Sequence, residues 1–256
     1  MAATPAVRAD FAAPHAYAER WFEEAFGEDY LTVYRHRDEE EARVLVGLIR
    51  SHVQCPEGSP ALDLGCGEGR HLRLLRHHHW TVGIDLSAPL LRFARAGDPD
   101  TSFVRADMRA IPFRSGMFQL VVNLFTSFGY FSDDVQNHRV LAEIARVTAP
   151  RGWLVLDFLN AVHVRKNLIP FDRKQIGSVV VEQKREISRD GYYVQKAVTV
   201  VGSDRVFRER VRLFELEELL SMVQSCDFRV RGVMGDYNGG PNTINSPRAI
   251  VIGQRS

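Results

Sequence analysis

The feature that most constrains this chain is a run of three glycines at alternate positions, Gly65, Gly67 and Gly69. An apolar segment, residues 60–64, leads directly into the run and carries one acid, Asp63. Glycine is needed where the backbone takes a positive φ angle or approaches a ligand closely. A helical pattern follows at once, so the run predicts a strand, a tight loop and a helix N-terminus. Free backbone N–H groups at such a junction form a cradle for a nucleotide-sized ligand.

A second acid follows at a spacing that completes this cradle. Residues 81–85 are another predicted strand, which ends in Asp85. An acid in this place can reach across the cradle and accept hydrogen bonds from a ribose. The glycine spacing is Gly-x-Gly-x-Gly, which differs from the Gly-x-Gly-x-x-Gly of dinucleotide-binding enzymes.

Together, residues 63–69 and 83–87 resemble the first two motifs of the class I S-adenosylmethionine-dependent methyltransferases. The resemblance covers residues 40–160 and 215–254. It implies S-adenosylmethionine as the cofactor, with the acid before the loop supporting both the loop and the charged end of the cofactor. The cofactor-binding residues that it implies in these two motifs are Asp63, Gly65, Cys66, Gly67, Gly69, Asp85 and Leu86.

Strands and helices alternate between residues 60 and 159, which predicts an α/β fold with a doubly wound, Rossmann-like parallel sheet. The resemblance adds a final helix and an antiparallel last strand. The predicted strands are residues 60–64, 81–85, 101–105, 118–124, 153–159, 228–234 and 248–253. The predicted helices are residues 16–31 in one or two pieces, 38–52, 70–77, a helix capped by Ser87, 133–147 capped by Ser132, and 215–226.

Three segments with alternating apolar and polar residues, 178–187, 192–201 and 206–214, predict an inserted antiparallel meander. The chain is therefore expected to have four parts. They are an N-terminal extension or helical cap (1–37), the cofactor-binding core (38–160), the antiparallel insertion as substrate cover or dimer surface (161–214), and a helix and strand pair that complete the core (215–256).

Two further pairs of residues lie at the ends of predicted strands, at the edge where an open α/β sheet binds its ligand. Asp107 and Met108 come after the third strand, where the resembled family places an acid near the adenine amino group and an apolar residue over the ring. An ordinary loop acid is the alternative. Asn123 and Leu124 end the fourth strand, and the predicted cofactor site includes both.

Residues 123–131 indicate the kind of acceptor. DNA and protein amide methylases carry prolines after the first residue of this run, and their absence here argues against a flipped base or an amide nitrogen. The run instead resembles the small-molecule branch, including amino-sugar and glycine-type N-methyltransferases, where a Ser-x-Gly-Tyr-like turn lines the pocket. Tyr130 or Phe125 is expected to line the pocket and to offer cation–π contact to a sulfonium. The alternative is that these aromatic residues belong to the core.

The segment before residue 38 contains the remaining candidates. The resemblance implies that Tyr34, His36 or Arg37 meets the methionine carboxylate or the acceptor, and a solvated linker is the alternative. Methyl transfer is an in-line displacement, so the protein mainly aligns the acceptor and excludes water. A base matters only where the acceptor must lose a proton, and the candidates are Tyr130, His36 and His138.

Composition argues against several other classes. A formal net charge of +1 gives no electrostatic footprint for nucleic acid or an anionic membrane, and no apolar run is long enough to span a bilayer. The three cysteines are scattered and the histidines 77–79 end a helix, so no metal site is predicted. A cytoplasmic location fits this cysteine usage.

The sequence thus predicts an S-adenosylmethionine-dependent methyltransferase that acts on a small molecule, with nitrogen favoured over oxygen as the acceptor. The alternatives are a tRNA or protein methyltransferase, an NAD-dependent dehydrogenase, and a non-catalytic nucleotide-binding module. The expected partner is the small-molecule acceptor, with no nucleic acid and no membrane, and the protein is expected to be a monomer or a homodimer.

Overall fold

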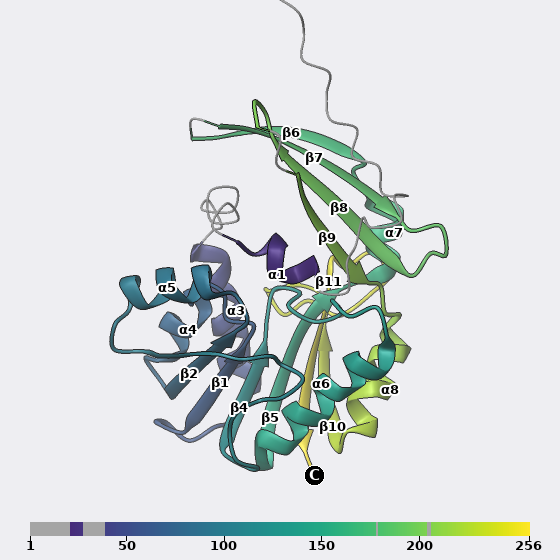
Figure 1. Cartoon of the computed structure of the whole chain (residues 1–256). Helices are drawn as coiled ribbons and strands as arrows, with labels where there is room; N and C mark the ends of the chain where they lie inside the picture. Colours follow the sequence, from purple (N-terminus) through teal and green to yellow (C-terminus); the bar gives the residue numbers. More distant parts are fainter. Residues whose placement is uncertain (1–20, 28–38, 178, 204–205) are drawn as a thin grey trace, which may run out of the picture.

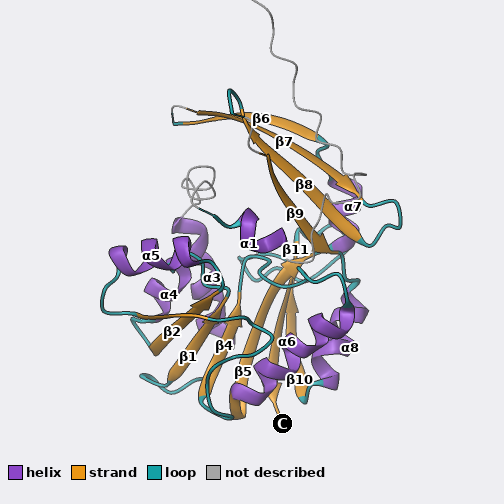
Figure 2. Cartoon of the chain, in the orientation of Figure 1, coloured by secondary structure: helices purple, strands orange, loops and turns teal. Residues whose placement is uncertain are grey.

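The computed structural model describes residues 21–27, 39–177, 179–203 and 206–256, which form two β-sheets and the helices around them (Figures 1 and 2). The larger sheet has seven strands. They are β1 (Pro60–Leu64), β2 (Trp80–Asp85), β3 (Ser102–Arg105), β4 (Phe118–Asn123), β5 (Thr148–Leu159), β10 (Phe228–Met234) and β11 (Arg248–Arg255). The smaller sheet, drawn above it, contains β6 (Phe171–Ile176), β7 (Val179–Ile187), β8 (Tyr193–Val200) and β9 (Val206–Arg212).

The strand order of the larger sheet is β10-β11-β5-β4-β1-β2-β3. β11 is antiparallel to both of its neighbours, whereas β5, β4, β1, β2 and β3 pair in parallel. This arrangement confirms the predicted doubly wound sheet with an antiparallel last strand. The chain order reverses between β1 and β4, and ligands of open α/β sheets bind at such a switch point.

The helices cover both faces of this sheet. In β4, Val121 packs into one apolar core with α6 (Asp134–Val147) and α8 (Leu216–Ser225). Its neighbours Leu120 and Val122 pack into a second core with α3 (Glu39–His52). A strand that is apolar on both faces is expected at the centre of a parallel sheet.

Near β1, β2 and β3 the sheet contacts α4 (Arg70–Leu75) and α5 (Ala88–Gly97). Ser87 caps α5 as predicted, because its Oγ accepts a hydrogen bond of 3.2 Å from the backbone N–H of Leu90. α4 ends two residues earlier than predicted, and the histidines that follow lie in a turn.

Two predicted boundaries around α6 are wrong. The N-cap is Asp133 and not Ser132, because the Asp133 carboxylate accepts a hydrogen bond of 2.8 Å from Val135 N–H. β5 begins at Thr148 and not at residue 153, since Thr148 already pairs with Phe118 before a register shift. The helix does end at Val147 as predicted.

The second sheet is longer than the predicted meander. Its three predicted strands are present as β7, β8 and β9, but the edge strand β6 and the helix α7 (Ala161–Asn167) were not predicted. β6 reads Phe-Asp-Arg-Lys-Gln-Ile and is mostly exposed, so it lacks the regular alternation that marks a half-buried strand. Within residues 16–31, the described part contains one short helix, α1 (Trp21–Ala25).

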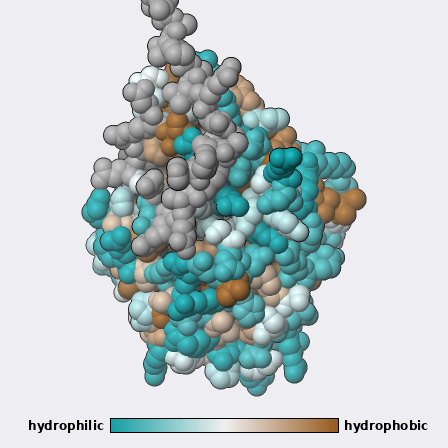
Figure 3. All heavy atoms as spheres, turned by 45° about the vertical axis from the view of Figure 1, so that its right-hand side comes forward, coloured by the Kyte–Doolittle hydropathy of each residue, from teal (hydrophilic) through white to brown (hydrophobic). Residues whose placement is uncertain are grey.

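The face of the molecule in Figure 3 is mostly hydrophilic over the described residues, and apolar side chains appear there in small separate areas. Such scattered exposure is ordinary for a globular protein. Within the part of the chain that the structure describes, no helix has the length and apolar character to cross a membrane.

Candidate functional site

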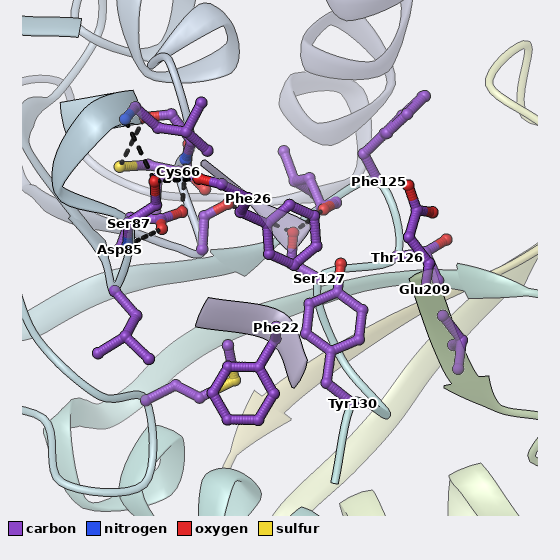
Figure 4. A pocket seen from close by; sticks show the side chains of 18 of the residues that line it. Phe22, Phe26, Cys66, Asp85, Ser87, Phe125, Thr126, Ser127, Tyr130 and Glu209 are labelled. Carbon is purple, nitrogen blue, oxygen red and sulfur yellow. Dashed lines mark hydrogen bonds between the residues drawn. The ribbon is translucent and has the colours of Figure 1, made fainter. Parts of the chain in front are cut away.

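A cavity of about 430 Å³ lies at the switch point of the larger sheet (Figure 4). It is lined by the glycine loop between β1 and α4, the loops after β2, β3 and β4, the helix α1, and the inner face of the second sheet. Its size falls within the range of small-molecule and cofactor sites. The cavity therefore joins the predicted cradle to segments whose role the sequence left open.

The glycine loop has the backbone that a close approach to a ligand requires. Gly65 and Gly67 have φ angles of 75° and 55°, and both line the cavity. A Cβ on Gly65 would lie 2.7 Å from the Cβ of Ser127, so no larger residue fits against the loop after β4. Gly69 also has a positive φ of 78°, but a Cβ there would meet the ring of Phe103 at 2.9 Å. Gly69 therefore allows packing behind the loop and does not line the cavity.

The two acids of the cradle are buried. Asp85 accepts hydrogen bonds of 2.8 Å from the backbone N–H groups of Gly67 and Ser87, and burial raises the pKa of its carboxyl group. Asp63 is 1% exposed. Burial, with a smaller contribution from Asp85, raises the pKa of Asp63 to about 7, while Arg70 acts in the opposite direction.

Asp63 supplies a test of whether a cofactor fits this cradle. Its Oδ2 atom is buried and, among the described residues, has no hydrogen-bond partner. A buried polar atom in a native protein normally has a partner, so this oxygen calls for a donor from a ligand or water. Together with the open space beside Gly67, where a Cβ would touch only Leu90 at 3.9 Å, the cradle fits a ligand with a cationic or N–H-bearing group.

Four other predicted cofactor residues line the cavity. Cys66 and Leu86 line the cavity, and burial raises the pKa of the Cys66 thiol, which keeps it protonated. Asp107 and Met108 also line the cavity, and Arg109 donates a hydrogen bond of 2.6 Å to Asp107.

Asn123 does not line the cavity, in contrast to its neighbour Leu124. It is fully buried, and its side-chain amide donates a hydrogen bond of 2.8 Å to the carbonyl oxygen of Leu64. Asn123 therefore ties the end of β4 to the end of β1 and supports the cradle from behind.

The loop after β4 contains backbone strain. Phe125 and Thr126 have φ angles of 56° and 63°, and two consecutive residues other than glycine are rarely left-handed. Both line the cavity. Strain of this kind costs about 1–3 kcal/mol per residue and persists only where surrounding contacts hold it.

Those contacts come from a buried network centred on Asp157, which is 0% exposed. Its carboxylate accepts hydrogen bonds from Phe125 N–H at 2.8 Å, Tyr237 O–H at 2.8 Å and Arg248 Nε at 2.7 Å. Its backbone carbonyl accepts a bond of 3.1 Å from Thr126 N–H, and Arg248 donates one of 2.9 Å to the Thr126 hydroxyl. The network holds both strained residues and presents Arg248 to the cavity.

Two side chains of this network have a raised pKa, Tyr237 and Arg248. Burial and the adjacent Asp157 charge raise the pKa of Tyr237, so its hydroxyl remains a donor. Burial opposes the charge of Arg248, but Asp157 and Tyr237 outweigh it and raise the pKa of the guanidinium.

The sequence did not reveal this network, because Tyr237 and Arg248 are 80 and 91 residues away from Asp157 along the chain. One signal was available. Asp157 is an acid inside the otherwise apolar strand 153–159, as Asp63 is inside 60–64.

The helix α1 covers part of the cavity with aromatic side chains. Phe22 on α1, Phe26 just after it and Tyr130 from the loop after β4 all line the cavity. Tyr130 confirms the expectation that the loop after β4 supplies a pocket-lining aromatic residue. The ring centroids of Phe26 and Tyr130 are 5.5 Å apart, and Trp21 Nε1 donates a hydrogen bond of 3.2 Å to the Tyr130 carbonyl. Ser87 Oγ donates one of 2.6 Å to the carbonyl of Phe26, which ties α1 to the cradle.

Of the other candidates, Tyr34, His36 and Arg37 lie outside the described residues. His138 lies on an exposed part of α6, contacts Ser225 Oγ at 3.0 Å and does not line the cavity. We therefore withdraw His138 as a candidate base. Among the described residues, no group of three or more His, Cys, Asp or Glu side chains could hold a metal ion.

Comparison with known proteins supports the enzyme class that the sequence predicts. A methyltransferase domain model matches residues 61–152. Over 247 residues the chain is 29% identical to a dTDP-3-amino-3,6-dideoxy-alpha-D-glucopyranose N,N-dimethyltransferase of Streptomyces fradiae, across 93% of this chain and 92% of that one. These matches support a class I S-adenosylmethionine-dependent methyltransferase. It is therefore a methyltransferase and not an NAD-dependent dehydrogenase.

Two further comparisons describe this methyltransferase. It is 35% identical over 119 residues to a dTDP-3-amino-3,4,6-trideoxy-alpha-D-glucopyranose N,N-dimethyltransferase of Streptomyces venezuelae, across 46% of this chain and 48% of that one. Its fold matches the CcbJ methyltransferase from Streptomyces caelestis with a TM-score of 0.78 and 16% identity, across 94% of this chain and 100% of that one. The methyltransferase fold, with its second sheet, thus extends over nearly the whole chain.

Proposed function

We propose that this methyltransferase transfers a methyl group from S-adenosylmethionine to the amino nitrogen of a nucleotide-linked amino sugar. The observation that carries the proposal is a single cavity that joins the cradle of Asp63, Gly67 and Asp85 to the strained loop after β4 and to the second sheet. The similarity to two dTDP-amino-sugar N,N-dimethyltransferases supports the class of acceptor.

In this proposal the cradle holds the cofactor, which supplies a methyl group already activated on a sulfonium. The orphaned Oδ2 of Asp63 accepts a hydrogen bond from the ammonium end of the cofactor. In the same proposal Asp85 accepts hydrogen bonds from the ribose hydroxyls, and Asp107 and Met108 contact the adenine. All three residues line the cavity, which supports these roles. Leu86 and Leu124 contribute apolar surface, and Gly65 and Gly67 leave room for the ligand.

The chain contributes mainly alignment and exclusion of water. The residues that line the acceptor side in this proposal are Tyr130, Thr126 and Arg248, and the network around Asp157 fixes the last two. The rings of Phe26 and Tyr130 offer cation–π attraction to a sulfonium. Tyr130 is the described residue that we propose to orient the acceptor nitrogen.

The same proposal includes the setting in which the enzyme works. Cys55, Cys66 and Cys226 are free, which suits a reducing cytoplasm. The four-part division of the chain remains a proposal, with residues 161–214 as the cover of the acceptor side. We propose a monomer or a homodimer that does not bind nucleic acid.

Titration calorimetry with S-adenosylmethionine, S-adenosylhomocysteine and NAD tests the cofactor. The proposal predicts micromolar binding of the first two and no binding of NAD. The acceptor is tested next, by calorimetry of the complex with S-adenosylhomocysteine against dTDP-3-amino-3,6-dideoxy-α-D-glucose. A protein that binds the cofactor but not this sugar nucleotide would show that the acceptor belongs to another class.

A further inference from the structure

The inner face of the second sheet brings an ion pair into the cavity. Lys196 on β8 and Glu209 on β9 are direct cross-strand partners. Their Nζ and Oε2 atoms are 3.5 Å apart, and the two side chains are only 18% and 20% exposed. Both residues line the cavity, together with Val194 and Val211 from the same two strands.

Stability alone does not explain why this position holds an ion pair and not two apolar residues. Taking two charges out of water costs free energy that their attraction only partly returns, and apolar residues of similar volume often do as well. The neighbouring cavity positions on the same strands are valines, which fill such a wall without this cost. A charge pair kept in a pocket of this kind therefore indicates recognition of a ligand.

The acids of the cavity divide by location. Asp63, Glu68 and Asp85 belong to the cradle and its first turns, and Asp107 belongs to the loop after β3. Among the described residues that line the cavity, Glu209 is the acid that the second sheet supplies. Figure 4 shows Asp85 at one end of the view and Glu209 at the other, beside Thr126, with Tyr130 between them in this projection.

We propose that Glu209 binds the amino group of the methyl acceptor and that Lys196 holds the Glu209 carboxylate in position. This inference rests on the proposed function and names the residue that selects an amine. A carboxylate accepts N–H hydrogen bonds from the ammonium and from the neutral amine, and it attracts the ammonium in addition. A hydroxyl in the same place offers one donor and no charge, so Glu209 favours amino over hydroxy sugars.

The experiment compares two ligands by calorimetry in the presence of S-adenosylhomocysteine. They are dTDP-3-amino-3,6-dideoxy-α-D-glucose and the sugar nucleotide with a hydroxyl in place of the amine. We expect the wild type to prefer the amino compound by about tenfold or more, since hydrogen bonds to charged groups are among the stronger ones. Glu209→Gln should reduce this preference to about threefold or less while the affinity for S-adenosylhomocysteine stays the same.

Two further variants separate recognition from folding. Glu182→Gln is the matched control. Glu182 lies on β7 of the same sheet, pairs with Arg173 on β6 at 3.7 Å and does not line the cavity. This variant should keep the wild-type preference. Glu209→Gln leaves Lys196 without its ion-pair partner. The charge swap Lys196→Glu with Glu209→Lys restores a cross-strand ion pair. It should therefore recover any thermal stability lost in Glu209→Gln, but not the preference for the amine.

The outcomes distinguish this inference from the proposed function. Equal preference in wild type and Glu209→Gln, or recovery of the preference in the charge swap, would overturn the role of Glu209 and leave the acceptor class intact. A wild type that binds neither sugar nucleotide would overturn the acceptor class, and with it the amine that Glu209 is proposed to bind.

Discussion

At the scale of single residues, the cradle shows a carboxyl group placed where its charge is costly without a ligand. Asp63 has an ordinary pKa of 3.8 and a pKa of about 7 in the folded protein, chiefly because it is buried. At pH values between these two pKa values, Asp63 keeps its proton in the folded state and releases it in the unfolded state. The free energy of unfolding therefore falls as the pH rises through this range.

Asp63→Asn should remove this penalty. We expect the ligand-free variant to be more stable than the wild type at pH 8, by about 1–3 kcal/mol, and to differ little near pH 4. Its affinity for S-adenosylhomocysteine should fall by about tenfold, because a charged hydrogen bond is lost. Urea unfolding at the two pH values and calorimetry measure both effects.

Asp98→Asn is the control of opposite sign. Asp98 is bound by Thr101 and Arg76, and these contacts outweigh its burial and lower its pKa. Its folded pKa lies below its unfolded value, so its stabilising contribution is present at pH 8 and is lost as the pH falls. Asp98→Asn should therefore destabilise the protein at pH 8. A loss of stability at pH 8 in Asp63→Asn as well would contradict our account of Asp63.

At the scale of elements, two loops from neighbouring strands pack against each other to form the site. The loop after β1 needs a glycine at residue 65, both for its φ of 75° and because Ser127 occupies the space of a Cβ. The loop after β4 is held by Asp157, Arg248 and Tyr237 from β5, β11 and the segment between β10 and β11. The glycine loop and the loop after β4 are therefore in direct contact, and a change in one is expected to displace the other.

Gly65→Ala tests this packing. The added Cβ meets Ser127 and the backbone keeps a conformation that alanine disfavours, so we expect about 1–3 kcal/mol of destabilisation and loss of cofactor binding. Adding Ser127→Gly should relieve the steric part and recover some of the affinity, but not the part due to φ. Thermal unfolding and calorimetry of both variants check this, and no gain from the second substitution would contradict the contact.

Tyr237→Phe tests the network that holds the strained loop. The variant removes a hydrogen bond to Asp157, which should cost about 1 kcal/mol of stability. We expect the rate of methyl transfer to fall by about tenfold, because acceptor alignment loosens, while the affinity for S-adenosylhomocysteine changes little. Tyr192→Phe, at a side chain that is mostly exposed, is the matched control and should leave the rate unchanged. Equal losses of rate and of cofactor affinity would argue that Tyr237 does not act through the loop after β4 alone.

The same elements explain what the sequence could and could not predict. The core strands were predictable because apolar runs and glycine punctuation are local signals, and β1 was predicted with its boundaries at Pro60 and Leu64. The edge strand β6 was not predictable because it is mostly exposed and lacks regular alternation. The roles of Arg248 and Tyr237 were not predictable because their contacts with Asp157 join distant parts of the chain. Asn123 was assigned to the site by its position, but its side chain bonds to Leu64 behind the cradle.

At the scale of the whole molecule, the second sheet completes a cavity that the larger sheet begins. The larger sheet provides the cradle at its switch point, and the second sheet adds Arg185, Lys196 and Glu209 to the opposite wall. The polar character of that wall suits a polar acceptor better than an apolar one. We therefore propose that the larger sheet binds the cofactor and that the second sheet selects the acceptor.

The most direct test of this assignment is mass spectrometry of the reaction with S-adenosylmethionine and dTDP-3-amino-3,6-dideoxy-α-D-glucose. We predict products that carry one and then two added methyl groups on the amino nitrogen, and no product from the matching hydroxy sugar nucleotide. Methylation of the hydroxy compound alone, or of neither compound by a protein that binds S-adenosylmethionine, would contradict the central claim that the cavity selects an amino sugar.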